Sequence, residues 1–312
     1  VAGPARARRG REMADAGVRR GVAVAVRDGR CAAVGPASDL RLDCAGATEV
    51  DCDGGVLTPG FIDSHTHAVF GAGRFAEQEL RATGVPYLEI ARRGGGIHSS
   101  VRDLRARSED DLLALALPRL ARIVASGVTT VEIKSGYGLS LVDELKTLRV
   151  IRRLAELVPC RVVPTFLGAH EIPIEYRERG GGREAYIAEV CEVMIPAVAR
   201  EGLARFADVF CERGVYTVAE SRRILEAARA HGLGLKLHAD ELEGSGGAEL
   251  AAELGAASAD HLGAISDAGI AALASSPTVA TLLPSTMLFL GRETQAPARA
   301  LIAQGAAVAL AT

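Results

Sequence analysis

Two histidines, His65 and His67, have the residue type and the spacing that metal chemistry requires. They end the stretch Thr58–His67, TPGFIDSHTH. The Pro-Gly pair in this stretch disfavours a helix and the residues after it have no helical period, so we expect a strand. Positions i and i+2 of a strand face the same side, which would bring the two imidazoles together. Two imidazoles on one face at the end of a strand make half of a metal site.

Three further histidines, His170, His238 and His261, also fall at the ends of predicted strands. A single histidine on an apolar strand is more often a hydrogen-bonded core residue than a ligand. Five of the seven histidines at equivalent strand ends favour a shared site instead. The reason is that the carboxyl ends of the strands of a parallel barrel meet at one mouth.

His238 begins the sequence His238-Ala239-Asp240-Glu241. We predict that His238 is the third metal ligand and that Glu241 is the catalytic proton shuttle. Neutral imidazoles hold a divalent ion, an open position on the ion binds water, and the ion lowers the pKa of that water to about 7. A neighbouring carboxylate can take the proton and return it to a leaving nitrogen. The alternative role for Glu241 is to stabilise a helix N-terminus.

The roles of His170 and His261 differ from those of the predicted ligands. His170, in FLGAH, is better placed to polarise or hydrogen-bond a substrate carbonyl than to bind the metal. His261 follows Asp260 and could orient the attacking water as a second catalytic residue. Either histidine could instead support the metal ligands structurally.

Lys134 bears on the number of metal ions. In some barrels a carboxylated lysine bridges two ions, and it would be expected on the fourth barrel strand. The predicted fourth strand, Phe206–Glu212, has no lysine, whereas Lys134 lies on the second. We therefore expect one divalent metal rather than two.

Arg74, Tyr87 and Tyr137 lie in loops that would surround the same mouth. A guanidinium pairs bidentately with a carboxylate, so an arginine among phenols suits an anionic small molecule. Most arginines of this chain are expected to be solvated on the surface, but Arg74 ends the glycine-containing sequence Gly71-Ala72-Gly73-Arg74 beside the predicted metal strand. We predict that Arg74, Tyr137 and Tyr87 bind substrate.

Eight apolar segments that predict strands alternate with segments of helical period. The predicted strands are Gly60–His67, Val128–Ser135, Arg161–His170, Phe206–Glu212, Leu233–Asp240, Ala257–Leu262, Thr278–Pro284 and Ala306–Thr312. The predicted helices are Asp110–Ala125, Leu141–Leu157, Arg183–Glu201, Val218–His231, Ala248–Leu254, Asp267–Ala274 and Ala296–Gln304. This alternation is typical of an α/β protein, and eight strands indicate a closed (β/α)8 barrel of TIM type. An open doubly wound sheet is the alternative.

The first residues of the chain have a different pattern. Val22–Val26 alternates, Asp28-Gly29 predicts a hairpin turn and Cys31–Val34 returns. Val50–Leu57 predicts a further short strand. We therefore expect a small β-rich domain over residues 1–57, of the sandwich type, and the barrel over residues 58–312.

The longest insertion, Ala68–Arg107, follows the first barrel strand. It is expected to contain a helix around Phe75–Arg92 that ends at Gly94-Gly95-Gly96. The glycine run either stops that helix or brings backbone close to a substrate, since long loops after barrel strands usually carry function.

The composition excludes several classes of protein. Of the 312 residues, 48% are hydrophobic and 24% charged, which is typical of a folded globular chain rather than a disordered one. A net charge of −3 gives no basic footprint for nucleic acid, and no apolar run approaches the roughly 20 residues of a membrane span. The six cysteines form no CxxC pair, so we expect free thiols in the cytoplasm rather than disulfides or metal ligands.

Together these motifs resemble the amidohydrolase superfamily and, within it, the imidazolonepropionases. TPGFIDSHTH and KLHADE resemble the superfamily in general. The narrower resemblance rests on HAVFGAGR, YLEIARRGGGI, EIKSGYGL, PTFLGAHEIP and LLPSTMLFLG, which extend over nearly the whole chain. A lone HxH is weak evidence, whereas this ordered set is specific.

The resemblance implies an enzyme with one divalent ion, zinc or iron. It would hydrolyse the cyclic amide C–N bond of 4-imidazolone-5-propanoate to N-formimidoyl-L-glutamate, in histidine degradation, as a cytoplasmic homodimer. The metal ligands implied are His65, His67 and His238. The substrate-binding residues implied are Arg74, Tyr87, Tyr137 and His170. Glu241 would move the proton and His261 would lie beside the water.

The resemblance also implies a fourth metal ligand, an aspartate that ends the eighth barrel strand, and a C-terminal segment that completes the β-rich domain. The sequence ends at Thr312, directly before the expected aspartate, and it begins without Met. We expect from this a chain cut at the end of strand eight, with weak metal binding and little activity if Thr312 were its natural end.

Two other functions stay open from the sequence. Another mononuclear amidohydrolase, such as a deaminase of a small heterocycle, would share the histidines and Glu241, and Arg74 and Tyr137 would distinguish it. A non-catalytic, metal-poor barrel is the other alternative, which stays open because the expected aspartate is missing from the sequence.

Overall fold

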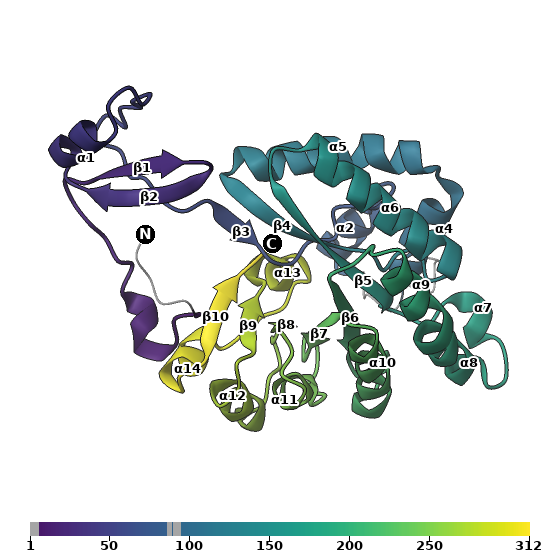
Figure 1. Cartoon of the computed structure of the whole chain (residues 1–312). Helices are drawn as coiled ribbons and strands as arrows, with labels where there is room; N and C mark the ends of the chain where they lie inside the picture. The colour runs from purple at the N-terminus through teal and green to yellow at the C-terminus, as the bar shows by residue number, and fades with distance from the viewer. Residues whose placement is uncertain (1–5, 86–88, 90–94) are drawn as a thin grey trace.

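Eight parallel strands form one sheet that curves into a nearly closed barrel (Figure 1). The computed structural model describes residues 6–85, 89 and 95–312. Neighbouring strands in the sheet follow one another in the chain: β3 Phe61–Asp63, β4 Val128–Lys134, β5 Arg161–Ala169, β6 Phe206–Cys211, β7 Gly234–Ala239, β8 Ser258–His261, β9 Val279–Leu282 and β10 Ala307–Leu310. The predicted (β/α)8 barrel is confirmed, and the open doubly wound sheet is excluded.

Thr312 joins the two ends of the sheet, β3 and β10. Its backbone N–H donates to Asp63 Oδ1 over 3.2 Å, and its hydroxyl donates to Asp63 Oδ2 over 2.5 Å. Asp63 is buried. Side-chain bonds therefore close the barrel where the strand ladder between β3 and β10 is missing from the described residues.

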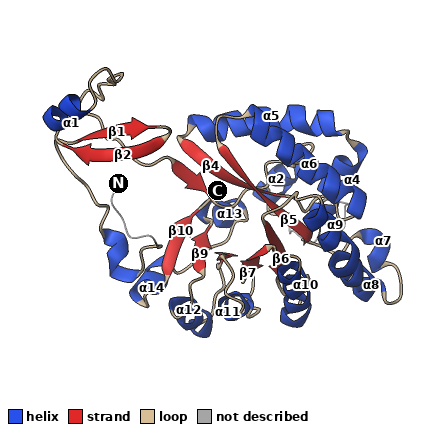
Figure 2. Cartoon of the chain, in the orientation of Figure 1, coloured by secondary structure: helices blue, strands red, loops and turns tan. Residues whose placement is uncertain are grey.

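The helices mostly surround the strands, although α13 overlaps the middle of the barrel in this view (Figure 2). They are α2 Phe75–Ala82, α4 Ile97–Ala106, α5 Glu109–Ala125, α6 Leu141–Leu157, α7 Ile174–Arg177, α8 Gly182–Glu189, α9 Ile195–Arg200, α10 Val218–Ala230, α11 Gly247–Glu253, α12 Asp267–Ala274, α13 Pro284–Phe289 and α14 Ala298–Ala303. The single helix predicted over Arg183–Glu201 consists of α8, the π-helical turn η2 Val190–Met194 and α9. Helices α4, α7 and α13 were not predicted.

Side-chain caps explain where the long helices begin. Ser108 accepts from the backbone N–H of Asp111, whose carboxylate accepts from the Ser108 N–H, and this capping box starts α5. Thr217 and Glu220 start α10 in the same way. Hydrogen bonds between residues three positions apart in the sequence thus determine where α5 and α10 begin.

The barrel strands separate an apolar outer face from a polar interior. On β4, Val131 and Ile133 belong to the apolar core, together with Leu120 of α5. The alternate residues Glu132 and Lys134 are also buried, but they contact charged groups of other strands: Glu132 contacts Lys236 of β7, and Lys134 contacts Asp208 of β6. The period of two along a strand therefore sends its ionisable side chains into the barrel.

The N-terminal hairpin is confirmed: β1 Ala23–Arg27 pairs antiparallel with β2 Arg30–Gly35 in a sheet of its own. Helix α1, Ala37–Asp43, follows it and was not predicted. The strand expected over Val50–Leu57 is wrong. There Asp53 donates its backbone N–H to Asp51 Oδ1 and has a φ of 46°, so the segment turns instead of pairing.

Residues near the N-terminus pack on the barrel. After Arg9 comes the 3₁₀ helix η1, Gly10–Ala14, and the Arg9 guanidinium donates to the carbonyls of Leu273 and Ala274 at the end of α12, over 3.1 and 2.9 Å. The division into a β-rich domain over residues 1–57 and a barrel over residues 58–312 stays a prediction.

The insertion after β3 contains α2 and α4. The predicted helix around Phe75–Arg92 corresponds to α2 as far as Ala82, whereas residues 86–88 and 90–94, including Tyr87 and Gly94, lie outside the described residues. All six cysteines are free. In the described part of the chain, no helix combines the length and the apolar character needed to cross a membrane.

Candidate metal centre and active site

The five strand-end histidines form one cluster. The Nε2 atoms of His67 and His238 lie 3.3 Å apart. Two groups of ring nitrogens lie close enough to hold an ion, and both contain His238. These groups are His65, His238 and His261, and His67, His170 and His238.

The cluster has the properties that a divalent metal requires. Two nitrogens bound to one tetrahedral zinc ion at about 2.0–2.1 Å would lie roughly 3.3 Å apart, which is the separation of the His67 and His238 nitrogens. Within the described residues, His67 Nδ1 and His261 Nε2 are buried without a hydrogen-bond partner. Burial lowers the pKa of His65 and His67 well below the ordinary value, and positive neighbours lower it further. Neutral imidazoles, the form that binds metal, are therefore favoured.

Strand β3 ends at Asp63, so His65 and His67 lie beyond it and not in it as predicted. Backbone bonds to β4 hold this segment instead. The N–H of Lys134 donates to the carbonyl of Thr66 over 2.9 Å, and the Thr66 hydroxyl donates to the carbonyl of Glu132 over 2.5 Å. These bonds fix the histidine pair against the neighbouring strand.

Glu241 lies beside the cluster. It is buried, and its Oε1 is 3.5 Å from Nδ1 of His261. Burial raises the pKa of Glu241 above its ordinary value, against the charges of His238 and Arg292. A carboxyl that holds its proton more readily than an exposed one is suited to proton transfer.

A second carboxylate supports the loop that carries Glu241. Glu212, at the end of β6, accepts from the backbone N–H groups of Leu242 and Glu243 over 2.9 and 3.3 Å. Asp240 accepts from the backbone of Ser245, Gly246, Gly247 and Ala248, at the start of α11. The residues on both sides of Glu241 are thereby fixed. The helix-stabilising role considered for Glu241 belongs to Asp240.

His170 and Tyr137 form one wall of the site. The ring centroids of His67 and His170 are 5.1 Å apart and stacked, and that of Tyr137 lies 5.4 Å from His170. Nδ1 of His170 is 3.0 Å from the carbonyl of Gly136. A donating Nδ1–H leaves Nε2 free to accept or to bind an ion. Both predicted substrate contacts thus lie at the cluster.

Arg74 lies in the loop between His67 and α2. Its Nη1 is 3.8 Å from Glu77 Oε2, and its side chain is partly exposed. Its charge is one of the smaller causes that lower the pKa of His170 to about 3, after burial and the charge of His238. Within the described part of the chain Arg74 forms its ion pair with Glu77, so its role in binding substrate stays a prediction.

The comparisons with known proteins agree with this geometry. The sequence profile of the amidohydrolase family matches residues 56–312. The imidazolonepropionase of Symbiobacterium thermophilum is 54% identical over 307 residues, which are 97% of this chain and 72% of that protein. The imidazolonepropionase of Myxococcus xanthus is 53% identical over 296 residues, which are 94% of this chain and 70% of that protein.

The chain belongs to the amidohydrolase family, and within it to the imidazolonepropionases. It is a hydrolase of a metal-dependent family.

Solved structures of other amidohydrolases share the fold of this imidazolonepropionase family member. An adenosine deaminase from Xanthomonas campestris with bound zinc superposes with a TM-score of 0.64 at 19% identity, over 94% of this chain and 64% of that chain. A 5-methylcytosine deaminase from Klebsiella pneumoniae has a TM-score of 0.64 at 17% identity, over 93% of this chain and 71% of that chain. At these identities the likeness concerns the fold alone.

The sequence reasoning missed a buried ionic network inside the amidohydrolase barrel. Its members are Glu132, Lys134, Asp208, Lys236 and Asp260. From the sequence, Lys134 is considered only as a residue that could bridge two metal ions. Its Nζ lies 2.7 Å from Asp208 Oδ2, and three carboxylates outweigh the effect of burial and raise its pKa above the ordinary value. Charged residues at alternate positions of apolar strands were the signal available in the sequence.

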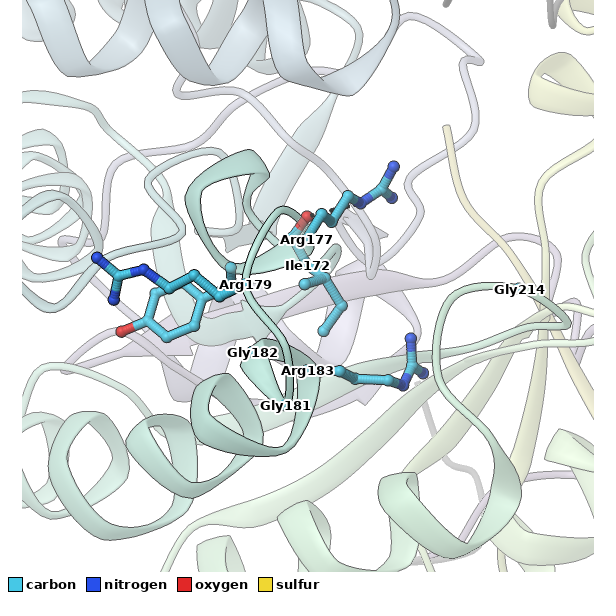
Figure 3. A pocket seen from close by; sticks show the side chains of 8 residues that line it. Ile172, Arg177, Arg179, Gly181, Gly182, Arg183 and Gly214 are labelled. Atoms are coloured by element: carbon cyan, nitrogen blue, oxygen red, sulfur yellow. Dashed lines mark hydrogen bonds between the residues drawn. The ribbon is translucent and has the colours of Figure 1, made fainter.

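Two hollows lie near the loops of the mouth. One of about 600 Å³ reaches His67 and Thr312 and is bordered by Phe70 and Arg119. Another of about 330 Å³ is lined by Arg177, Arg179 and Arg183 (Figure 3). Arg179 points away from the other two, which are paired with Glu171 and Glu220. The three guanidinium groups therefore do not converge on one anion.

Proposed function

We propose that this protein hydrolyses the cyclic amide C–N bond of 4-imidazolone-5-propanoate and forms N-formimidoyl-L-glutamate, a step of histidine degradation. The observation that carries the proposal is a cluster of five strand-end histidines beside buried Glu241, in a chain more than half identical to imidazolonepropionases.

His65, His67 and His238 are the proposed ligands of one divalent ion. His238 shares one group of ring nitrogens with His65 and the other with His67, and its Nε2 lies 3.3 Å from that of His67, which supports His238 as the ligand common to both. An ion bound there would polarise the substrate carbonyl and activate water for attack. Imidazole suits both zinc and iron, so metal analysis of the purified protein has to distinguish them.

Glu241 is the proposed proton carrier. Its carboxylate takes the proton of the attacking water and delivers it to the ring nitrogen that leaves, so that the C–N bond breaks without forming an amide anion. The raised pKa of Glu241 supports the second half of this transfer. His261, 3.5 Å from Glu241, is proposed to orient the water.

Arg74, Tyr137 and His170 are the proposed substrate-binding residues. The Arg74 guanidinium would pair with the propanoate carboxylate, and His170 would hydrogen-bond the ring carbonyl. Tyr137 lies beside both His67 and His170, which supports a contact to the ring. Binding by Tyr87, assembly as a homodimer and a cytoplasmic location stay predictions.

The proposal is tested by assaying the purified, metal-loaded protein with imidazolonepropionate. We expect loss of the ring chromophore with stoichiometric appearance of formimidoylglutamate. A protein that carries metal and leaves this substrate intact, but releases ammonia from an aminoheterocycle, would be a deaminase instead. Metal without turnover of either substrate would indicate a non-catalytic barrel.

A further inference from the structure

Five ionisable side chains are buried inside the barrel beneath the histidine cluster. Glu132 and Lys134 come from β4, Asp208 from β6, Lys236 from β7 and Asp260 from β8. None is more than 5% exposed. Such a group of charges away from water is costly unless every member is paired.

The two ammonium groups pair with all three carboxylates. Lys134 Nζ lies 2.7 Å from Asp208, 3.0 Å from Glu132 and 3.4 Å from Asp260. Lys236 Nζ lies 2.9 Å from Glu132 and 3.4 Å from Asp260. Two positive charges thus face three negative ones, and one negative charge is left over near the histidines.

Two of the carboxylates also contact predicted metal ligands. Asp260 Oδ2 lies 2.7 Å from Nδ1 of His65. Asp208 Oδ2 lies 3.1 Å from Nδ1 of His238 without the alignment of a hydrogen bond, and Asp208 Oδ1 accepts the backbone N–H of His238 over 3.0 Å. A carboxylate at Nδ1 favours the tautomer with its proton there, which leaves the lone pair on Nε2.

Lys236 contacts the backbone of the same segment. Its Nζ donates to the carbonyl of Ser64, the residue before His65, over 2.8 Å. The network therefore holds this segment at two points: the side chain of His65, which contacts Asp260, and the carbonyl of Ser64, which contacts Lys236.

Stability alone does not account for these charges. Replacement of a buried ion pair by well-packed apolar residues is often neutral or stabilising. In this network the oxygens Asp260 Oδ2 and Asp208 Oδ2 each face both a lysine and the ring of a predicted metal ligand. With one negative charge in excess, such an arrangement is instead suited to a cation above it.

We propose that Asp260 and Asp208 are positioning residues of the metal centre. Asp260 sets the ring orientation and tautomer of His65, whereas Asp208 holds the backbone of His238 and places its negative charge beside the ring; Lys134 holds both carboxylates in place, and Lys236 holds Asp260. This inference rests on the metal ligands of the proposed function. Asp260 has the larger role, because its contact with the ring nitrogen is shorter than that of Asp208.

The test uses Asp260→Asn and Asp208→Asn in the full-length protein. Zinc affinity is measured by competition with a chelator, and the ligand field by the visible absorption of the Co²⁺-substituted protein. We expect zinc to bind about 10- to 100-fold more weakly, with the larger loss for Asp260→Asn, and an altered Co²⁺ spectrum. The asparagine keeps the shape of the side chain but removes the charge and presents an N–H₂ group to a ring nitrogen or a lysine.

Glu144→Gln is the matched control. Glu144 is as deeply buried as Asp260 and accepts the backbone N–H groups of Gly136, Gly138 and Leu139, so its variant should lose stability without a change in zinc affinity or Co²⁺ spectrum. If Asp260→Asn does not fold, Ser258→Ala takes its place, because it removes only the hydroxyl bond to Asp260. Wild-type zinc affinity in the folded Asp208 and Asp260 or Ser258 variants would overturn the inference.

These readouts need no substrate. A protein whose zinc affinity depends on Asp260 but which leaves imidazolonepropionate intact would refute the proposed function and keep this inference. If the wild-type protein turns over the substrate but the variants keep wild-type zinc affinity, the proposed function stands and this inference is refuted.

Discussion

Nε2 of His67 and Nε2 of His238 lie 3.3 Å apart, although 171 positions separate the two residues in the chain. Two neutral imidazoles can meet in this way if one nitrogen donates to the other, or if both accept and a cation lies between them. The presence of His170 in the same group of ring nitrogens favours the cation, since three acceptors cannot satisfy one another.

Removal of His238 should abolish metal binding. His238→Ala takes a donor from both groups of ring nitrogens, so we expect less than a tenth of the wild-type metal content and no measurable turnover. Metal content is read by elemental analysis. His231→Ala, at the exposed end of α10, is the control and should keep both properties. Full metal content in His238→Ala would rule out the proposed ligand set.

Glu241→Gln should separate chemistry from binding. The amide has the shape of the carboxyl but cannot carry the proton, so kcat should fall by about 10²- to 10⁴-fold, the usual contribution of general acid–base catalysis. Metal content and KM should change little. Steady-state kinetics of the metal-loaded variant measure both constants, and a kcat near that of the wild type would assign the proton transfer to another group.

Arg74→Ala should weaken binding of the anionic substrate. Hydrogen bonds to charged groups contribute about 1.5–3 kcal/mol, which corresponds to a rise in KM of roughly 10- to 100-fold. The KM for a neutral amide analogue of the substrate should rise far less in Arg74→Ala. Arg299→Ala, at an exposed arginine on α14, is the control. An equal effect of Arg74→Ala on both substrates would contradict carboxylate recognition.

Glu144→Gln should disturb the loop that carries Tyr137. The Glu144 carboxylate accepts from the backbone N–H groups of Gly136, Gly138 and Leu139 over 3.1, 2.8 and 2.9 Å. The glutamine side chain would point its own N–H₂ group at one or more of these backbone N–H groups and leave them without an acceptor. The expected loss of folding stability is about 1–3 kcal/mol. We expect a lower free energy of unfolding in urea and a raised KM. A raised KM with wild-type stability would point to a direct substrate contact instead.

Acid should destabilise the metal-free protein below neutral pH. Burial first, and then the charge of His238, lower the pKa of His170 and of His261 to about 3. In the unfolded chain both titrate near 6.5, so the unfolded state binds more protons between these values. The stability is present above pH 6.5 and is lost as the pH falls towards 3, by about 1.4 kcal/mol per pH unit for each histidine.

Urea unfolding of the chelator-treated protein at pH 7.5, 6 and 5 measures this loss. In His170→Gln the free energy of unfolding should change less steeply with pH, because one proton fewer is taken up on unfolding. A free energy of unfolding that does not change over this range would show that the buried histidines are not held neutral.

Much of the barrel could be predicted from the sequence, because its signals are local. Leu141–Leu157 and Asp267–Ala274 have the predicted bounds, since Ser140 and Ser266 cap them at their first turn. The strand expected at Val50–Leu57 failed because a strand also requires a partner edge, which local alternation does not report. Helix α4 was missed inside a segment interpreted as loop.

By itself, the sequence determined the eight strands, the five histidines at their ends and Glu241, because residue type and spacing along the chain carry those features. Only the tertiary structure decided that His65 faces Asp260 and that Lys134 is an ammonium ion among three carboxylates. The physical reason is that β4, β6, β7 and β8 bring their inward side chains together only when the sheet curves into a barrel. Pairing across a barrel depends on this curvature and on strand register, and neither is encoded in the period of any single strand.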